Sequence, residues 1–313
     1  MGQQAMIPKV QVFLSTYNGD KYLSQQLDSL INQSNVEVSI LIRDDGSTDG
    51  TLSILQSYKK IYDCVDFYCG NNEGYAKSFL HLLTQNVKAD YFAFCDQDDV
   101  WLPEKLSHGI KKIRENITVK NKKKPVLYAT ALKRVDENLN FLSMQRFKKL
   151  NLSLGAEFTR HRLAGCTFIF NSSLYLLLQK AYSVQELVCS HDRLATILCL
   201  SAGGKVIFDN NSYILFRRHS TNASVDGVVF VRKILKRFNY FMINSGKDHR
   251  LAETVFKYWR DFIDKKNYKI FCDIISYKKN IKRRLCLSIS KEIDCGFWYY
   301  NIFIRLMILI KKF

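Results

Sequence analysis

The 313-residue chain has little of several features that mark particular classes of protein. Three prolines and no excess of glycine leave no linker of that composition between domains. The nine cysteines occur singly, without a Cys-x-x-Cys pair, which disfavours a zinc ribbon or a thioredoxin-like site. No apolar run reaches the roughly 18 residues of a membrane-spanning helix. The start, MGQQAMIPKV, lacks the apolar core of a signal peptide, so we expect a cytoplasmic protein with reduced cysteines.

The chain is rich in apolar and basic residues. Hydrophobic residues make up 47% of it and aromatic residues 13%, enough for a large core, which excludes disordered and fibrous classes. The formal net charge is +18, and residues 226–313 carry 20 Lys and Arg against 8 Asp and Glu. We therefore expect a first domain over residues 1–225 and a basic, aromatic-rich helical region over residues 226–313. Such a region suits an anionic partner, either a membrane surface or a nucleic acid.

The first 100 residues alternate apolar runs with helical patterns. Strands are expected at 9–14, 36–42, 65–69 and 91–95, and helices at 20–33, 51–58 and 76–83. This order predicts an α/β fold with a parallel sheet and helices on both faces. Further strands are expected at 126–132, 165–170, 206–208 and 213–216, and further helices at 173–181 and 192–200.

Polar clusters follow each of the first four predicted strands. They occupy residues 15–19, 44–49, 70–74 and 96–99. Ligands of parallel sheets bind beyond the carboxyl ends of the strands, where these four segments would meet. The sequence therefore predicts one polar pocket at this edge of the sheet.

The segment CDQDDVW places three carboxylates, Asp96, Asp98 and Asp99, directly after a buried strand. A helix start would need only one of them as a cap. Three carboxylates so close together repel one another, and a divalent cation shared with substrate phosphates would compensate them. We favour a metal and phosphate site over a simple cap.

Four other motifs border the same pocket. In RDDGSTDGT, a turn and a helix cap do not explain Asp44 and Asp45, whose carboxylates could accept a hydrogen bond from a nucleotide base. The STYNG segment could hold a base and ribose, although it is also a good turn. Asp192 in SHDR is either a helix cap or an active-site acid. His219 in RRHS belongs either to a solvated basic loop or to a phosphate clamp with a metal ligand.

Together these motifs resemble those of family 2 glycosyltransferases, particularly bacterial polysaccharide rhamnosyltransferases. The matching segments cover roughly residues 9–220 and are STYNG, IRDDGSTDGT, NNEGYAKS, FCDQDDVWLPEKL, LAGCTFIFN, HDRLA and FRRH. The resemblance implies a GT-A fold, in which a Rossmann-like, mostly parallel sheet is flanked by helices. The basic C-terminal region lies outside the shared pattern.

The resemblance also implies roles for the matching residues. The nucleotide sugar would contact Ser15, Thr16, Tyr17, Asn18, Asp45, Gly46, Lys77, Asp96, Gln97 and Asp98. Asp98 and His219 would hold Mg²⁺ or Mn²⁺, and Asp192 would be the catalytic base. Gly165, Cys166 and Trp101 would lie on the acceptor side. His191 departs from the family pattern, since many members carry Glu before the catalytic Asp.

The implied reaction is an inverting, metal-dependent transfer of a sugar from a nucleotide donor to a cell-surface polysaccharide or a lipid-linked acceptor. The resemblance points to L-rhamnose from dTDP-rhamnose, and glucose, galactose or an N-acetylhexosamine are the alternatives. A nucleic-acid-binding protein is an alternative of another class, but its sheet edge would carry basic residues rather than carboxylates, so we expect no nucleic-acid partner. A catalytically inactive scaffold and a nucleotidyltransferase are further alternatives.

The C-terminal region is expected to attach the protein peripherally to the inner face of the cell membrane. Basic residues cluster at 278–284, and aromatic residues lie among them at 238–241 and 298–300. The apolar stretch Phe297–Ile310 contains Arg305 and could lie in a membrane interface. Alternatively, these helices simply pack on the catalytic domain.

Overall fold

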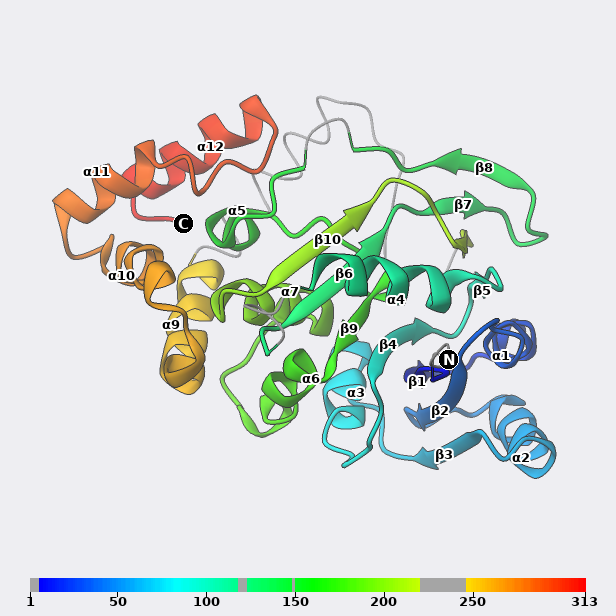
Figure 1. Ribbon diagram of the computed structural model, residues 1–313. Coiled ribbons are helices and arrows are strands. Elements are labelled where there is room, and N and C mark those ends of the chain that lie inside the picture. The colour runs from blue at the N-terminus through cyan, green and yellow to red at the C-terminus, as the bar shows by residue number, and fades with distance from the viewer. Residues whose placement is uncertain (1–5, 118–122, 148–149, 220–245) are drawn as a thin grey trace, which may run out of the picture.

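The computed structural model describes residues 6–117, 123–147, 150–219 and 246–313 (Figure 1). Its central sheet has seven strands in the order β10-β6-β9-β4-β1-β2-β3. Their bounds are β1 (Lys9–Thr16), β2 (Glu37–Asp44), β3 (Val65–Cys69), β4 (Tyr91–Asp96), β6 (Val126–Thr130), β9 (Ile169–Asn171) and β10 (Lys205–Asp209). All neighbouring strands pair in parallel except β9, which is antiparallel to β4 and to β6. The predicted mostly parallel α/β fold is confirmed.

Helices cover both faces of this sheet because its strands are apolar on both sides. Along β1, Val12 and Leu14 face α1 (Leu23–Ile31), α2 (Thr51–Ile61) and α4 (Lys105–Asn116). Phe13 points to the other face, where α3 (Tyr75–Leu82), α6 (Ser172–Leu178) and α7 (His191–Ser201) lie. Alternation of side chains along a strand thus divides the core into two layers.

A second sheet of four strands, which the sequence did not predict as a unit, lies beside the first. It has the order β5-β11-β7-β8, with β5 (Val100–Trp101), β7 (Lys133–Val135), β8 (Phe141–Met144) and β11 (Ile214–Arg217). The strands contain two to four residues, too few for an alternating pattern to stand out. β11 pairs with β5, which brings the segment after Phe216 next to the loop of Asp98.

The predicted strand at 165–170 is wrong over its first half. Gly165–Thr167 forms a short 3₁₀ helix, η2, and only Ile169–Asn171 pairs in the sheet. The Thr167 hydroxyl donates to the carbonyl of Ala164 at 2.7 Å, a local bond that favours the turn over an extended chain. The other predicted elements exist, with ends that differ by a few residues.

The C-terminal region is helical, as predicted, over its described part. It contains α9 (Lys247–Trp259), η4 (Arg260–Phe262), η5 (Lys265–Asn267), α10 (Tyr268–Ser276), α11 (Ile281–Ile289) and α12 (Trp298–Leu309). These helices share a hydrophobic cluster with α5 (Leu154–Thr159), α6 and α7, and Figure 1 shows them together at one end of the molecule. No helix among the described residues is long and apolar enough to cross a membrane.

Specific contacts fix this packing. The indole nitrogen of Trp259 donates to the carbonyl of Leu177 at 2.7 Å, and the Tyr300 hydroxyl donates to the carbonyl of Thr159 at 3.2 Å. The alternative in which the C-terminal helices pack on the catalytic part therefore holds for one of their faces. The division at residue 225 stays a prediction, because the boundary and the aromatic segment 238–241 lie outside the described residues.

Candidate active site

The predicted polar loops do meet, and they enclose a pocket of about 540 Å³ at the carboxyl ends of the central strands. Nine predicted site residues line it: Ser15, Tyr17, Asp45, Asp96, Gln97, Asp98, Gly165, Cys166 and Asp192. Seven other residues complete the wall: Asn72, Gly74, Tyr75, Phe79, Ala164, His191 and Phe216. The mixture of carboxylates and aromatic rings suits a ligand with a planar ring and a charged, hydroxylated part.

Gln97 ties the loop after β1 to the loop after β4. Its side-chain oxygen accepts hydrogen bonds from the Thr16 hydroxyl at 2.6 Å and from the backbone N–H of Tyr17 at 2.8 Å. The side-chain oxygen of Asn18, whose φ of 48° lies in the left-handed region, accepts from the backbone N–H of Thr48 at 2.8 Å. Thr16 and Asn18 therefore shape the wall of the pocket rather than line it.

Asp45 is buried and already bound by the chain. Its carboxylate pairs with the Arg43 guanidinium and accepts from the backbone N–H groups of Glu73, at 3.1 and 3.2 Å, and Gly74, at 2.9 Å. Asp45 thus fixes the loop after β3 while it lines the pocket. Gly46 has a φ of 84°, and a Cβ there would lie 3.3 Å from the backbone nitrogen of Asn72, so this turn requires glycine.

Besides Asp45, the carboxylates of Asp96, Asp98 and Asp192 line the pocket. Burial, together with the charges of Asp98 and Asp192, raises the pKa of Asp96 to about 7. The Asp98 carboxylate lies 2.8 Å from Nε2 of His219, so the structure brings together the two residues predicted to bind the metal. The site is therefore short of positive charge, which is the condition that a bound divalent cation relieves.

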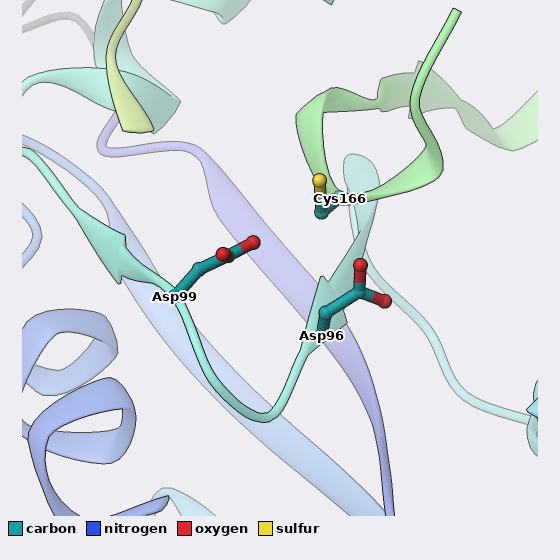
Figure 2. Close-up of side chains that lie close together, drawn as sticks. All are labelled: Asp96, Asp99 and Cys166. Carbon is teal, nitrogen blue, oxygen red and sulfur yellow. The ribbon is translucent and has the colours of Figure 1, made fainter. Parts of the chain in front are cut away.

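A second group of possible metal ligands contains Asp96 itself. Asp96, Asp99 and Cys166 each offer one atom, and the three atoms lie within 4.8 Å of one another (Figure 2). Burial raises the pKa values of the Cys166 thiol and the Asp99 carboxyl well above their usual ranges. A thiol is a poor ligand for Mg²⁺ or Mn²⁺, which prefer oxygen. Asp98 and His219 fit such an ion better.

Three residues of the predicted motifs do not line the pocket. Trp101, expected on the acceptor side, is 2% exposed in the core, where the ammonium of Lys105 lies 3.2 Å from its ring centroid. Lys77 lies on the exposed side of α3 and does not line the pocket. Arg217 is not a phosphate clamp, because its buried guanidinium donates to the carbonyl of Asp98 and the side chain of Gln25, at 2.8 and 2.6 Å.

Asp192 begins α7 and has a histidine partner that sequence reasoning missed. Nε2 of His161 lies 3.3 Å from the Asp192 carboxylate, and Nδ1 of His161 contacts the carboxylate of Glu157. Burial would lower the pKa of His161, but Glu157 and Asp192 outweigh it and raise the pKa to about 10. Burial would raise the pKa of Asp192, but the His161 cation holds it well below its usual range. Asp192 is therefore ionised.

His191, the neighbour that departs from the family pattern, plays a different part. Its ring stacks on Phe79 at 3.9 Å between centroids, and burial lowers its pKa to about 4, so it is neutral. A Cβ at Gly165 would lie 2.7 Å from Nε2 of His191 and 3.0 Å from Cβ of Asp192. Glycine at position 165 is what lets the start of α7 approach the pocket.

Comparison with known proteins assigns the chain to a family. Residues 11–170 match the model of "Glycosyl transferase family 2". The chain belongs to glycosyl transferase family 2. An uncharacterized glycosyltransferase of Rickettsia typhi is 26% identical to this chain over an alignment of 318 residues. The alignment covers 96% of this chain and 95% of the relative. The dTDP-rhamnosyl transferase RfbG of Shigella flexneri is 25% identical over 230 residues, which cover 70% of this chain and 76% of the relative.

The fold of this glycosyltransferase is also that of a solved relative. It resembles S. aureus TarS 1–349 in complex with UDP-GlcNAc with a TM-score of 0.52 at 18% identity, over 97% of this chain and 93% of that one. The similarity confirms the GT-A fold that the motifs implied.

The sequence contains only weak signals for the site residues that it did not predict. Glu157 and His161 are four positions apart, a spacing that predicts a contact on a helix, but it gives no hint of Asp192 as the third partner. Tyr75 and Phe216 read as ordinary aromatic residues. Only the meeting of α3, β11 and α7 around one cavity shows that they form its wall.

Proposed function

We propose that this glycosyltransferase is an inverting, metal-dependent enzyme that transfers a sugar from a nucleoside diphosphate donor. One observation carries the proposal: the pair of Asp98 and His219 and the ionised Asp192 flank a single pocket. An inverting displacement needs a site that stabilises the leaving diphosphate and one base, with no second nucleophile. The pocket has this composition.

The donor would lie across the loops after β1, β2 and β4. Tyr17 and Tyr75 are exposed aromatic side chains at the pocket, 46% and 59% accessible, and can stack on a base. Ser15 and Asp45 would contact the base and ribose. Asp98 and His219 would hold Mg²⁺ or Mn²⁺, which when bound would neutralise charge on the diphosphate as it leaves.

Asp192 would act as the base. The acceptor hydroxyl gives its proton to the carboxylate while its oxygen bonds to the anomeric carbon, and the bond from that carbon to the diphosphate oxygen breaks. Attack comes from the face opposite the leaving group, so the configuration inverts. His161 would keep the carboxylate ionised before the proton arrives.

The proposed donor is dTDP-L-rhamnose, and the proposed acceptor is lipid-linked or a growing cell-surface polysaccharide. The similarity to the Shigella flexneri dTDP-rhamnosyl transferase supports the sugar, together with the motifs shared with polysaccharide rhamnosyltransferases. A transferase of glucose, galactose or an N-acetylhexosamine is the alternative within the family.

We further propose that the enzyme attaches to an anionic membrane through α11 and α12. On α11, Ile281, Leu285 and Ile289 recur every four residues and are 52 to 75% exposed. On α12, Trp298 and Ile302 are 75% and 53% exposed. Basic side chains flank both helices at 278–284 and 311–312. An apolar face within a basic rim is typical of interfacial helices.

Measurement of sugar transfer tests the proposed reaction. The enzyme is assayed with a panel of nucleotide sugars and a lipid-linked acceptor, and Asp192→Asn is compared with the wild type. Transfer from one donor with inversion is expected, and the variant should lose transfer but keep its dissociation constant for the nucleotide. Retained turnover in the variant would exclude Asp192 as the catalytic base. Retention of configuration at the anomeric carbon would exclude a single displacement.

Vesicle flotation decides the membrane attachment. Deletion of residues 278–313 would expose the core, because Ile304 and Phe313 are fully buried, so point variants are the better test. Ile289→Asp and Ile302→Asp should lower binding to anionic vesicles, and salt should weaken binding of the wild type. Ile61→Asp, at an exposed apolar residue of α2, is the matched control. Equal flotation of all variants would exclude this surface.

A further inference from the structure

A second cavity of about 500 Å³ adjoins the donor pocket, and its arginines have no part in the mechanism above. We call it the arginine pocket, because its wall contains Arg134, Arg160, Arg162 and Arg218. Among the described residues that line it there is no aspartate or glutamate. Guanidinium groups gathered around one cavity favour an anion with several oxygen atoms as the ligand.

Aromatic rings hold two of these arginines in place. The guanidinium carbon of Arg162 lies 4.3 Å from the ring centroid of Phe147 and 4.4 Å from that of Phe297. The guanidinium of Arg160 lies 4.6 Å from the same Phe297 ring, and its buried Nη1 has no hydrogen-bond partner within the described chain. Burial and the neighbouring Arg160 lower the pKa of Arg162. The two cations therefore repel each other in a fixed geometry, and a bound anion would relieve the repulsion.

The arginine pocket lies on the side from which an acceptor would reach the base. Ala164 and Phe216 line both cavities, so the two are neighbours in space. His161 also lines the arginine pocket, and its Nε2 is 3.3 Å from the Asp192 carboxylate in the donor pocket. A sugar attached to an anion bound by the arginines could therefore place its hydroxyl at Asp192.

We propose that the arginine pocket binds the diphosphate group of a lipid-linked acceptor. This inference rests on the proposed transfer reaction and specifies its acceptor. The donor diphosphate already has the site at Asp98 and His219, so a second cluster of cations is not needed for the donor. A lipid is favoured over a soluble polymer because Phe297, in the wall, directly precedes α12 and its exposed Trp298. A chain that leaves the pocket would meet the apolar face of that helix.

Acceptor preference tests the proposal in the full-length enzyme. Two acceptors carry the same sugar, one on a short prenyl diphosphate and one on an uncharged alkyl chain of equal length. The wild type should prefer the diphosphate acceptor in kcat/KM by roughly 10- to 100-fold, the effect of one or two charged hydrogen bonds. Arg160→Gln and Arg162→Gln should lose most of that preference through a higher KM, and Arg162→Lys should keep part of it. Arg250→Gln, at an exposed arginine of α9, is the matched control and should keep all of it.

The outcomes separate the acceptor site from the reaction. Unchanged preference in both glutamine variants, with normal folding by circular dichroism, would overturn the arginine pocket and leave the transferase proposal standing. Equal loss with the uncharged acceptor would also overturn it. A preference for a phosphate-bearing soluble polymer over the prenyl diphosphate would assign the pocket to a polymer. Absence of transfer to any acceptor, with nucleotide-sugar binding also absent in the wild type, would instead contradict the proposed function.

Discussion

The buried contact between His161 and Asp192 predicts how His161→Gln will change the pH dependence of transfer. In the wild type, the His161 cation holds the pKa of Asp192 well below its usual range, so the base is ionised throughout the working range. Glutamine removes the cation, while burial remains. Burial disfavours the carboxylate, so the pKa of Asp192 must rise.

The size of the rise follows from burial. The side chains of His161 and Asp192 are 15% and 19% exposed, so each is largely removed from water. Loss of one partner of a buried pair costs about 3 kcal/mol or more, which is a shift of roughly 2 pH units. We expect the ratio of variant to wild-type kcat/KM to fall as the pH is lowered and to recover as the pH is raised.

The assay is a pH profile of kcat/KM with nucleotide binding measured in parallel. His108→Gln is the matched control, because His108 pairs with Asp209 at 3.2 Å outside the pocket. A ratio that stays constant with pH would mean that His161 has only a structural role and would refute the reasoning.

The pH dependence of the free energy of unfolding gives a second test of the same contact. The pKa of His161 is raised to about 10, so its stabilising contribution is complete below about pH 6.5 and is lost as the pH rises through 10.

Two further changes test the rest of the site. Asp98→Asn should lower transfer by roughly 100-fold or more, because it removes a ligand of the proposed cation, and the melting temperature should change little. Excess EDTA should lower transfer by the wild type in the same way. Full activity in either assay would exclude the metal role. Gly165→Ala should lower kcat by tenfold or more, because a Cβ would lie 2.7 Å from the His191 ring and displace the start of α7; an unchanged rate would show that α7 can shift without moving Asp192.

The sequence determined the fold because its signals are local. Apolar runs alternate with helical periodicity along the first 100 residues, and this order allows little but a parallel sheet with helices on both faces. The same argument located the pocket, since loops after parallel strands share one edge. Asp96, Asp98 and Asp192 line the pocket as the motifs implied, because Asp96 ends β4, Asp98 lies in the loop after β4, and Asp192 lies in the first turn of α7.

Tertiary structure decided what the side chains do there. Trp101 follows the acidic motif by two residues, but pairing of β5 with β11 turns it into the core. Glu157, His161 and Asp192 are joined only because α5 packs on α7, and the arginine pocket forms only where the loop after α5 meets Phe297 before α12. One of these contacts, between Arg162 and the carbonyl of Cys295, joins residues 133 positions apart. No local sequence pattern predicts which distant residue will face a given side chain.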